Sequence, residues 1–174
     1  MGYTHYWNNP KKEVNQCDLV EIRGFIDTVL KNNSNIISYE SEVLQTPELY
    51  VVWSENYINC RFNGIGEDGH ETFSVSKDNF DFCKTAHKPY DTVVCQVLLI
   101  YQHFFDIDLS SDGFFNNQPK GNTYEVGDTV GLEHLDGTWG EALTSVNNLL
   151  NTNYQFVVDS VYGNRNQYFS YVLR

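Results

Sequence analysis

The residues best suited to chemistry lie in one short segment, residues 79–91, directly before the most apolar run of the chain, residues 92–105. Lys84, His87 and Lys88 are cationic or potentially cationic side chains that follow one another closely in this segment. The apolar run is long enough for a buried helix, so these side chains would lie at the mouth of a rigid element. Because free N–H groups at a helix start favour anions, the segment predicts a site for phosphate or carboxylate.

A simpler interpretation of the same segment is an exposed polar loop whose lysines offset the nearby Asp78, Asp81 and Asp91. Cys83 also allows two interpretations. Beside Lys84 its thiol could have a lowered pKa and act as a nucleophile. Alternatively, it is a small packed residue between aromatic neighbours, and we favour this second interpretation.

Two histidines could provide acid–base chemistry. His5 and His70 belong to different expected strands and could converge in one cleft as general acid, general base or metal ligands. Asp91 or Glu71 could orient such an imidazole. Because His70 and Glu71 are adjacent, on a strand they would point to opposite faces and could not bind one ion together. The ordinary alternative for each histidine is a surface position or a hydrogen-bonded core position.

Composition restricts the class of protein. The chain has 174 residues, enough for one domain with a large core and no need for disulfides. Its 12 Tyr and 11 Phe predict a core rich in aromatic packing. With 11 Lys and Arg against 23 Asp and Glu, the net charge of −12 argues against non-specific nucleic-acid binding. An acidic surface gives solubility, or it provides a face for a basic partner.

Compartment and cofactors are inferred from smaller signals. The cysteines show neither a C-x-x-C pair nor zinc-type spacing with histidine, so we expect reduced thiols, no metal and no cofactor. No basic and then apolar leader opens the chain. The longest apolar run, residues 93–101, is too short to span a bilayer. We therefore predict a cytoplasmic protein without membrane contact.

Hydrophobic periodicity predicts the elements. Strands are expected at residues 2–7, 36–39, 49–53, 57–62, 70–76, 107–110 and 129–132. Three helices are expected. The first runs from Asp18 to Lys31, with Asp18 as its cap and Glu21 as the reciprocal partner. The second covers residues 90–105, with Pro89 in its first turn, and the third begins at Thr138, which forms a capping box with Glu141. Residues 111–113 read as a turn, residues 114–137 as a long loop or insertion, and residues 154–161 with 167–173 as a hairpin. The order predicts a single α+β domain, residues 1–174, with a largely antiparallel sheet, about three helices, a central buried helix at 90–105 and a C-terminal β-hairpin.

Two motif-like strings are rejected. The segment Gly64–Gly69 satisfies G-x-G-x-x-G, but a strand pattern follows it instead of a helix, and Glu67 and Asp68 would repel phosphate, so we interpret it as a hairpin turn. The cluster Asp106, Asp108 and Asp112 lacks the glycine and distal glutamate of an EF-hand.

Several short motifs occur in a fixed order: Gly2-Tyr-Thr-His-Tyr6, Phe62-Asn-Gly64, His70-Glu-Thr-Phe73, Phe80-Asp-Phe-Cys-Lys-Thr-Ala86, Lys88-Pro-Tyr-Asp91 and Ser110-Ser-Asp-Gly113. In this order they resemble an uncharacterised family of small proteins found in bacteriophages, other large viruses and some bacteria. The resemblance implies a phage- or virus-type accessory protein in the host cytoplasm. It also marks one recurring polar set: His5, Asn63, His70, Glu71, Lys84, Thr85, Lys88, Asp91, Ser111 and Asp112.

Three functions remain open, and the oligomeric state is not predicted. The leading hypothesis is a polar cleft for a small anionic metabolite such as a nucleotide, bound by Asn63, Lys84, Thr85, His87, Lys88, Ser111 and Asp112. The second is a hydrolase with His5 or His70 as general base, oriented by Asp91 or Glu71. The third is a non-catalytic inhibitor whose acidic surface binds a basic host protein. The first two require that the polar set gathers in one hollow.

Overall fold

Helical and strand periodicities along the chain produce two sheets with helices on one side. The computed structural model describes residues 2–8, 10–38, 51–54, 57–75, 80–115, 124–135, 137–162 and 168–174. The helices are α1 (Gln16–Asn32), α2 (Asp91–Phe105) and α3 (Gly137–Leu150), with short 3-10 turns η2 (Gly66–Asp68) and η3 (Leu132–His134). The strands are β1 (Thr4–Trp7), β2 (Ile37–Ser38), β3 (Val51–Ser54), β4 (Tyr57–Gly64), β5 (Phe73–Val75), β6 (Asp81–Lys84), β7 (Leu109–Phe115), β8 (Thr129–Val130), β9 (Phe156–Tyr162) and β10 (Tyr168–Leu173). The predicted α+β class is confirmed.

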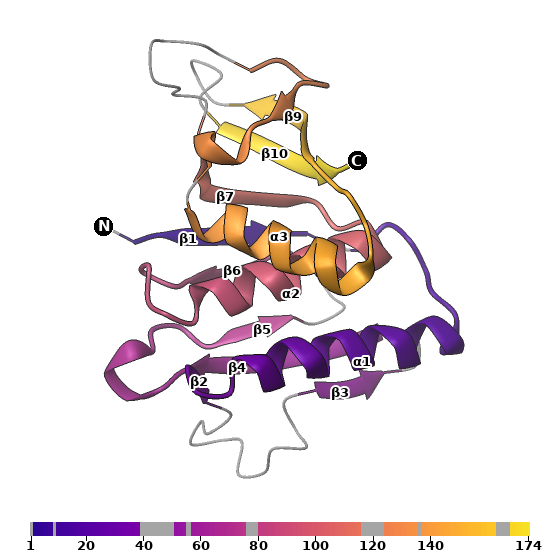
Figure 1. Cartoon of the computed structure of the whole chain (residues 1–174), viewed down its shortest axis with the longest axis vertical. Helices are drawn as coiled ribbons and strands as arrows, with labels where there is room; N and C mark the ends of the chain where they lie inside the picture. Colours follow the sequence, from indigo (N-terminus) through magenta and orange to yellow (C-terminus); the bar gives the residue numbers. More distant parts are fainter. Residues whose placement is uncertain are drawn as a thin grey trace.

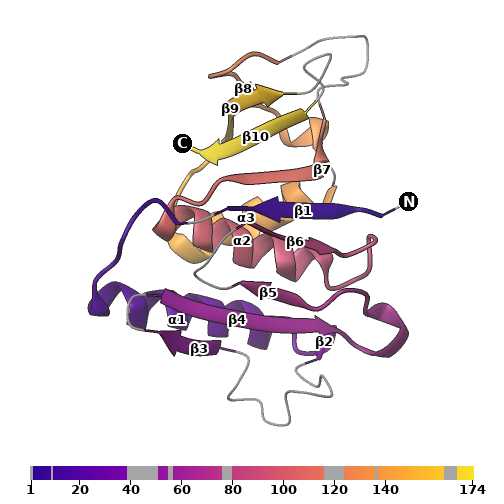
Figure 2. The ribbon, with the colours of Figure 1, turned by 180° about the vertical axis from the view of Figure 1, so that it is seen from behind.

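The strands pair antiparallel in two sheets. The larger sheet has the order β6-β1-β7-β10-β9-β8, and the smaller has the order β2-β4-β3 with β5 also on β4. The strands β9 and β10 form the predicted C-terminal hairpin. The three helices lie in front of the sheets in Figure 1, and the strands lie in front of the helices in Figure 2. In the part of the chain that the structure describes, helices therefore cover one face of the larger sheet and leave the other face open.

The core lies between the sheets and the helices. Along β1, His5 and Trp7 point to the covered side and are buried, whereas Tyr6 points to the open side and is half-buried. Helix α2 is buried on nearly all sides, as a helix that is apolar all round should be, and this confirms the predicted central helix. No helix in the described ranges is long and apolar enough to cross a membrane.

The helix starts differ from the predicted ones. The N-cap of α1 is Asn15 and not Asp18. The Asn15 Oδ1 accepts from the Asp18 N–H at 2.8 Å. In return, the Asp18 Oδ2 accepts from the Asn15 N–H at 3.2 Å, which completes a capping box. Pro89 lies in the turn before α2, whose N-cap is Tyr90. Thr138 lies inside the first turn of α3, where its hydroxyl bonds the carboxylate of Asp91, so the predicted capping box with Glu141 is wrong.

Two strand predictions are also corrected. Residues 111–113 do not form a turn, because β7 continues through them and Ser111 pairs with His5 of β1. A register shift between β7 and β10 accommodates this passage. Among the described residues, the strand expected at 70–76 is β5 from Phe73 to Val75, so His70 and Glu71 precede it. The G-x-G-x-x-G segment connects β4 to its antiparallel neighbour β5 through η2, as expected of a hairpin. Within the predicted long loop, residues 116–123 and residue 136 lie outside the described part of the chain.

Candidate functional site

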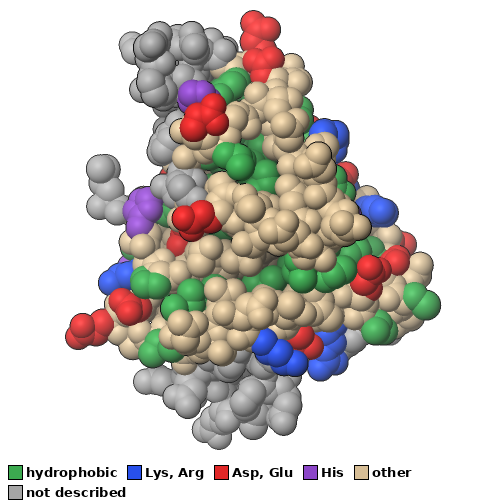
Figure 3. Space-filling view, viewed as in Figure 1, with side chains coloured by type: hydrophobic (Ala, Val, Ile, Leu, Met, Phe, Trp, Pro, Cys, Tyr) green, Lys and Arg blue, Asp and Glu red, His purple; other side chains and the backbone are tan. Residues whose placement is uncertain are grey.

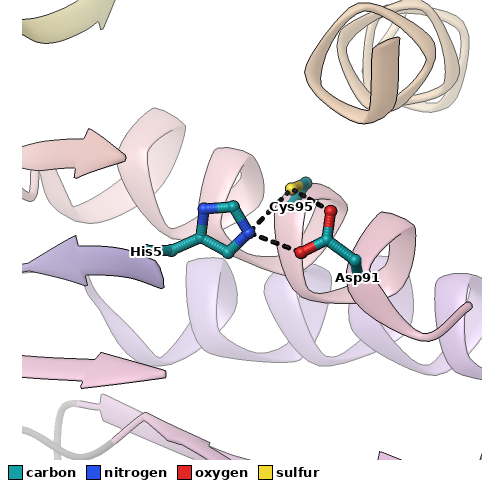
Figure 4. Close-up of side chains that lie close together, drawn as sticks. All are labelled: His5, Asp91 and Cys95. Carbon is teal, nitrogen blue, oxygen red and sulfur yellow. Dashed lines mark hydrogen bonds and ion pairs between the residues drawn. The ribbon is translucent and has the colours of Figure 1, made fainter. Parts of the chain in front are cut away.

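The centre of the larger sheet contains a buried polar network around His5. In β1, His5 pairs with Cys83 of β6 on one side and with Ser111 of β7 on the other. Its imidazole is 0% exposed, with Nδ1 2.7 Å from Ser111 Oγ and Nε2 2.6 Å from Asp91 Oδ1. Figure 4 shows His5 reaching from β1 toward Asp91 and Cys95 on α2. The sequence therefore brings His5, Asp91 and Ser111 together, as the hypothesis of a common site requires.

Asp91 is the anionic centre of this network. Burial acts to raise its pKa, but hydrogen bonds from His5, Thr85 and Thr138 outweigh burial and hold the pKa of Asp91 below its ordinary value. The carboxylate also lies in the first turn of α2, where the helix dipole favours negative charge. The helix start that we predicted to attract an external anion thus already has an anion of its own.

A strained turn positions Thr85 beside Asp91. Ala86 and His87 adopt left-handed backbone conformations, with φ of 51° and 57°, which cost about 1–2 kcal/mol each for residues with a side chain. The turn is held because the carbonyl of Tyr3 accepts from the N–H groups of Thr85 at 3.0 Å and Ala86 at 3.3 Å. The ring of His87 stacks on Tyr3, with centroids 3.7 Å apart. As a result the Thr85 hydroxyl donates to Asp91 Oδ1.

The protons of the network can be assigned by counting donors. Ser111 Oγ accepts from the Gly113 N–H and from Trp139 Nε1–H, each at 3.0 Å, which uses both of its lone pairs. The Ser111 hydroxyl hydrogen must then be donated to His5 Nδ1. The imidazole hydrogen accordingly lies on Nε2 and is donated to Asp91. Every polar atom of the chain Ser111–His5–Asp91 has a partner.

Cys95 makes this centre the one group of potential metal ligands among the described residues. The ligand atoms of His5, Asp91 and Cys95 lie within 4.8 Å of one another (Figure 4). Ligands of one tetrahedral ion are separated by roughly 3.3 Å or more, whereas His5 Nε2 and Asp91 Oδ1 are 2.6 Å apart and share a hydrogen. The geometry is that of a hydrogen-bonded pair, and Cys95 packs beside it.

The order hydroxyl, imidazole, carboxylate is also that of a Ser-His-Asp triad. Here the hydroxyl oxygen already accepts two hydrogen bonds, and Ser111 is only 6% exposed. A substrate carbonyl could not approach it without displacing Trp139 and Gly113. The pairing of His5 with Asp91 agrees with the hydrolase hypothesis, but its environment is that of a structural network.

The remaining predicted residues form separate contacts at the rim. The side-chain amide of Asn63 makes its hydrogen bonds within the connection between β4 and β5. Its Oδ1 accepts from the N–H groups of Gly64 and His70, and its Nδ2 donates to the His70 carbonyl and to Thr72 Oγ1. His70 itself is exposed, whereas His5 is fully buried, so the two imidazoles do not line one cleft.

Glu71 and the lysines also make local contacts. Glu71 Oε2 accepts from the Lys84 N–H at 2.8 Å, and Lys88 Nζ donates to the Glu67 carbonyl at 2.9 Å. Cys83 is buried and its pKa is raised to about 12 by burial, which confirms packing over the nucleophile interpretation. The anion site at Lys84, His87 and Lys88 stays a prediction.

The structure reveals a second candidate site that the sequence did not: a groove on the open face of the larger sheet. Two adjoining hollows of about 380 Å³ each share Tyr6, Phe80, Ser110 and Tyr162 in their lining, and we call them together the open groove. Phe80 is 58% exposed and Tyr162 is 45% exposed, which is unusual for large aromatic side chains on one face. Tyr6 stacks beside Phe80 with centroids 6.1 Å apart.

The open groove has a regular construction. Ser110 of β7, Ser170 of β10 and Ser160 of β9 pair directly across the strands and form its floor. Tyr6 and Phe80 stand on one side, and Tyr162 stands on the other. Small hydroxyl side chains between aromatic ones leave a channel that runs along the strands.

Among the described residues, the charged side chains that line the open groove are all negative. They are Asp108 and Asp159 at one end and Asp112 at the other, and the described lining has no basic residue or histidine. Lys11 contacts the first end from outside the lining: its Nζ donates to Asp108 Oδ1, and this hydrogen bond is the main reason that its pKa is raised, with further contributions from Asp106 and Asp159. On the helix-covered side, by contrast, side chains of both signs are present (Figure 3).

Fold and site define an α+β protein with a closed Ser–His–Asp network inside and an acidic, aromatic groove outside. No protein-family model, curated protein or solved structure matches the chain.

Proposed function

We propose that the protein is a non-catalytic binding protein that takes up a basic segment of another protein in the open groove. The observation that carries this proposal is the combination of exposed aromatic rings with carboxylates in one groove on an uncovered sheet face. Aromatic faces attract ammonium and guanidinium groups, and carboxylates complement their charge. The proposal corresponds to the third hypothesis from the sequence.

Hollow size and net charge support the same conclusion. Hollows of about 380 Å³ are large enough for a side chain or small ligand, since binding pockets typically have volumes of about 300–1,000 Å³. The net charge of −12 would speed the encounter with a basic partner through long-range attraction. The buried network around His5 would serve this function indirectly, by fixing β1 and β7, two of the strands that form the groove.

The test is a binding assay with a defined probe, a fluorescein-labelled peptide of alternating arginine and serine, followed by fluorescence anisotropy at physiological salt. The groove variant Asp112→Asn with Asp159→Asn should weaken binding about tenfold, since the two lost charge contacts contribute about 0.7 kcal/mol each and about 1.4 kcal/mol together. The matched control is Glu67→Gln with Asp68→Asn, which removes the same charge from the exposed turn η2.

The control variant distinguishes binding in the open groove from attraction by the net charge of the whole protein. If both double variants bind the peptide with the same reduced affinity, attraction is due to net charge alone and the proposal fails. It fails equally if the wild-type protein does not bind the basic peptide at physiological salt.

A further inference from the structure

The length of the open groove and the negative charge at each of its two ends define its partner more closely. Asp108 directly precedes β7 and Asp112 lies within it, so they are four residues apart along an extended chain, a span of about 13 Å at about 3.3 Å per residue. Both lie on the open side with Ser110 between them, because side chains alternate along a strand.

The cross-strand register places the other groups at matching positions. Ser170 of β10 pairs with Ser110 of β7 and with Ser160 of β9, so these serines form one row across the sheet. Asp159 directly precedes Ser160 and lies toward the Asp108 end. Tyr162 follows Ser160 and lies toward the Asp112 end. Each end of the groove therefore combines at least one carboxylate with the shared aromatic side chains.

The Asp108 end already binds a cation of the chain itself. Lys11 Nζ donates to Asp108, and the pKa of Lys11 is raised by that hydrogen bond and by the charges of Asp108, Asp106 and Asp159. This contact shows that the local field there stabilises an ammonium group. The Lys11 and Asp108 side chains are 50% and 40% exposed, so their ion pair is weak and a basic side chain of a partner can take the place of Lys11. At the Asp112 end, Asp112 Oδ2 accepts from the Thr4 N–H at 3.0 Å, and the described lining has no basic side chain, so the carboxylate keeps its charge for an incoming cation.

We propose that the open groove contains two cation subsites, and that its partner is an extended polypeptide segment with two basic side chains four residues apart. This inference rests on the proposed function. In an extended segment, residues i and i+4 lie on the same side about 13 Å apart, which matches Asp108 and Asp112. Residues i and i+3 lie on opposite sides, and a pair at i and i+2 spans only about half the distance.

The experiment compares three labelled nine-residue peptides of identical composition, made of serine and threonine with two arginines spaced by four, three or two positions. Fluorescence anisotropy with the full chain should show the four-spaced peptide binding about tenfold more tightly than the other two, because only that peptide fills both subsites. The Asp112→Asn variant should remove this preference and bind all three peptides alike, whereas Asp68→Asn should keep it.

The outcomes distinguish this inference from the proposed function. Equal affinities for the three peptides in the wild type would overturn the two-subsite inference while leaving the groove as a basic-peptide site. No binding of any peptide would overturn both. Spermidine that binds as tightly as the four-spaced peptide would identify a small polycation as the occupant and refute a protein segment. Self-association of the free chain that Asp112→Asn abolishes would identify a second copy as the occupant and do the same.

Discussion

Replacing Asp91 with asparagine is expected to lower the free energy of unfolding by about 3 kcal/mol, a large part of the about 5–15 kcal/mol that holds a typical domain, because a hydrogen bond to a charged group contributes about 1.5–3 kcal/mol. The carboxylate accepts hydrogen bonds from His5 Nε2, Thr85 and Thr138 in a buried position. An amide of the same shape offers one acceptor oxygen and one NH₂ group, so at least one of these donors would face another donor. Urea unfolding of both proteins measures the difference.

The control for this variant is Asp159→Asn, since Asp159 is exposed and substitutions at such positions change stability by only about 0.5 kcal/mol. An Asp91→Asn protein that loses less than about 1 kcal/mol would contradict the assigned network. The direction of the effect is also informative for the hydrolase hypothesis. Groups arranged for catalysis are commonly held at a cost in stability, so replacing them often stabilises the protein. A gain in stability of the Asp91→Asn protein would therefore favour a catalytic role of Asp91 over a structural one.

The stabilising effect of Asp91 should depend on pH in a defined direction. Because the pKa of Asp91 is lowered in the folded protein, its contribution is fully present above the ordinary aspartate value of 3.8 and is lost as pH falls through the lower folded value. The difference in unfolding free energy between wild type and Asp91→Asn should thus be constant at neutral pH and shrink below pH 3.8. Parallel urea titrations along a pH series measure it.

Local patterns in the sequence predicted much of the fold. The alternation of residues 2–7, the helical spacing from Leu19 and the apolar run after Asp91 each specify one element, because burial requires those periods. The wrong predictions concern the ends of helices and strands, where neighbouring residues are alternative caps or turn formers. Asn15 and Asp18 are both good caps, and only the reciprocal pair in the structure decides between them. At Ser111–Gly113, turn-forming residues lie within a strand because pairing with β1 and β10 outweighs local preference.

The sites were predicted less well because they depend on strand order. The resemblance brought His5, Asp91 and Ser111 into one set, but nothing local indicates that Trp139 donates to Ser111. The open groove joins Tyr6 near the start of the chain to Tyr162 near its end. Strand alternation along residues 2–7 does predict that Tyr6 faces away from His5 and Trp7. The adjacency of β1, β7, β10 and β9 could not be read from the sequence, because it arises from long-range pairing.

Two neighbouring serines provide the sharpest test of how the sheet separates its two faces. Ser111→Ala is expected to lower the free energy of unfolding by about 3 kcal/mol or more, since it leaves His5 Nδ1, the Gly113 N–H and Trp139 Nε1–H buried without a partner, at about 1–3 kcal/mol each. Ser110→Ala, one residue earlier in β7, removes the same atom from the open groove, where water can replace it, and should change stability by no more than about 0.5 kcal/mol.

Variants at the same two positions should have the opposite effects on peptide binding. Ser110 forms the floor of the open groove between Asp108 and Asp112, whereas the hydroxyl of Ser111 points into the helix-covered core. A larger side chain, Ser110→Leu, should therefore block the basic peptide while leaving the unfolding free energy within about 1 kcal/mol of the wild type. Urea unfolding and peptide anisotropy on Ser110→Leu and Ser111→Ala together measure both quantities. If Ser110→Leu bound the peptide normally, the partner would not lie over the floor of the groove. If Ser111→Ala were as stable as the wild type, the proton assignment that makes Ser111 a donor to His5 would be wrong.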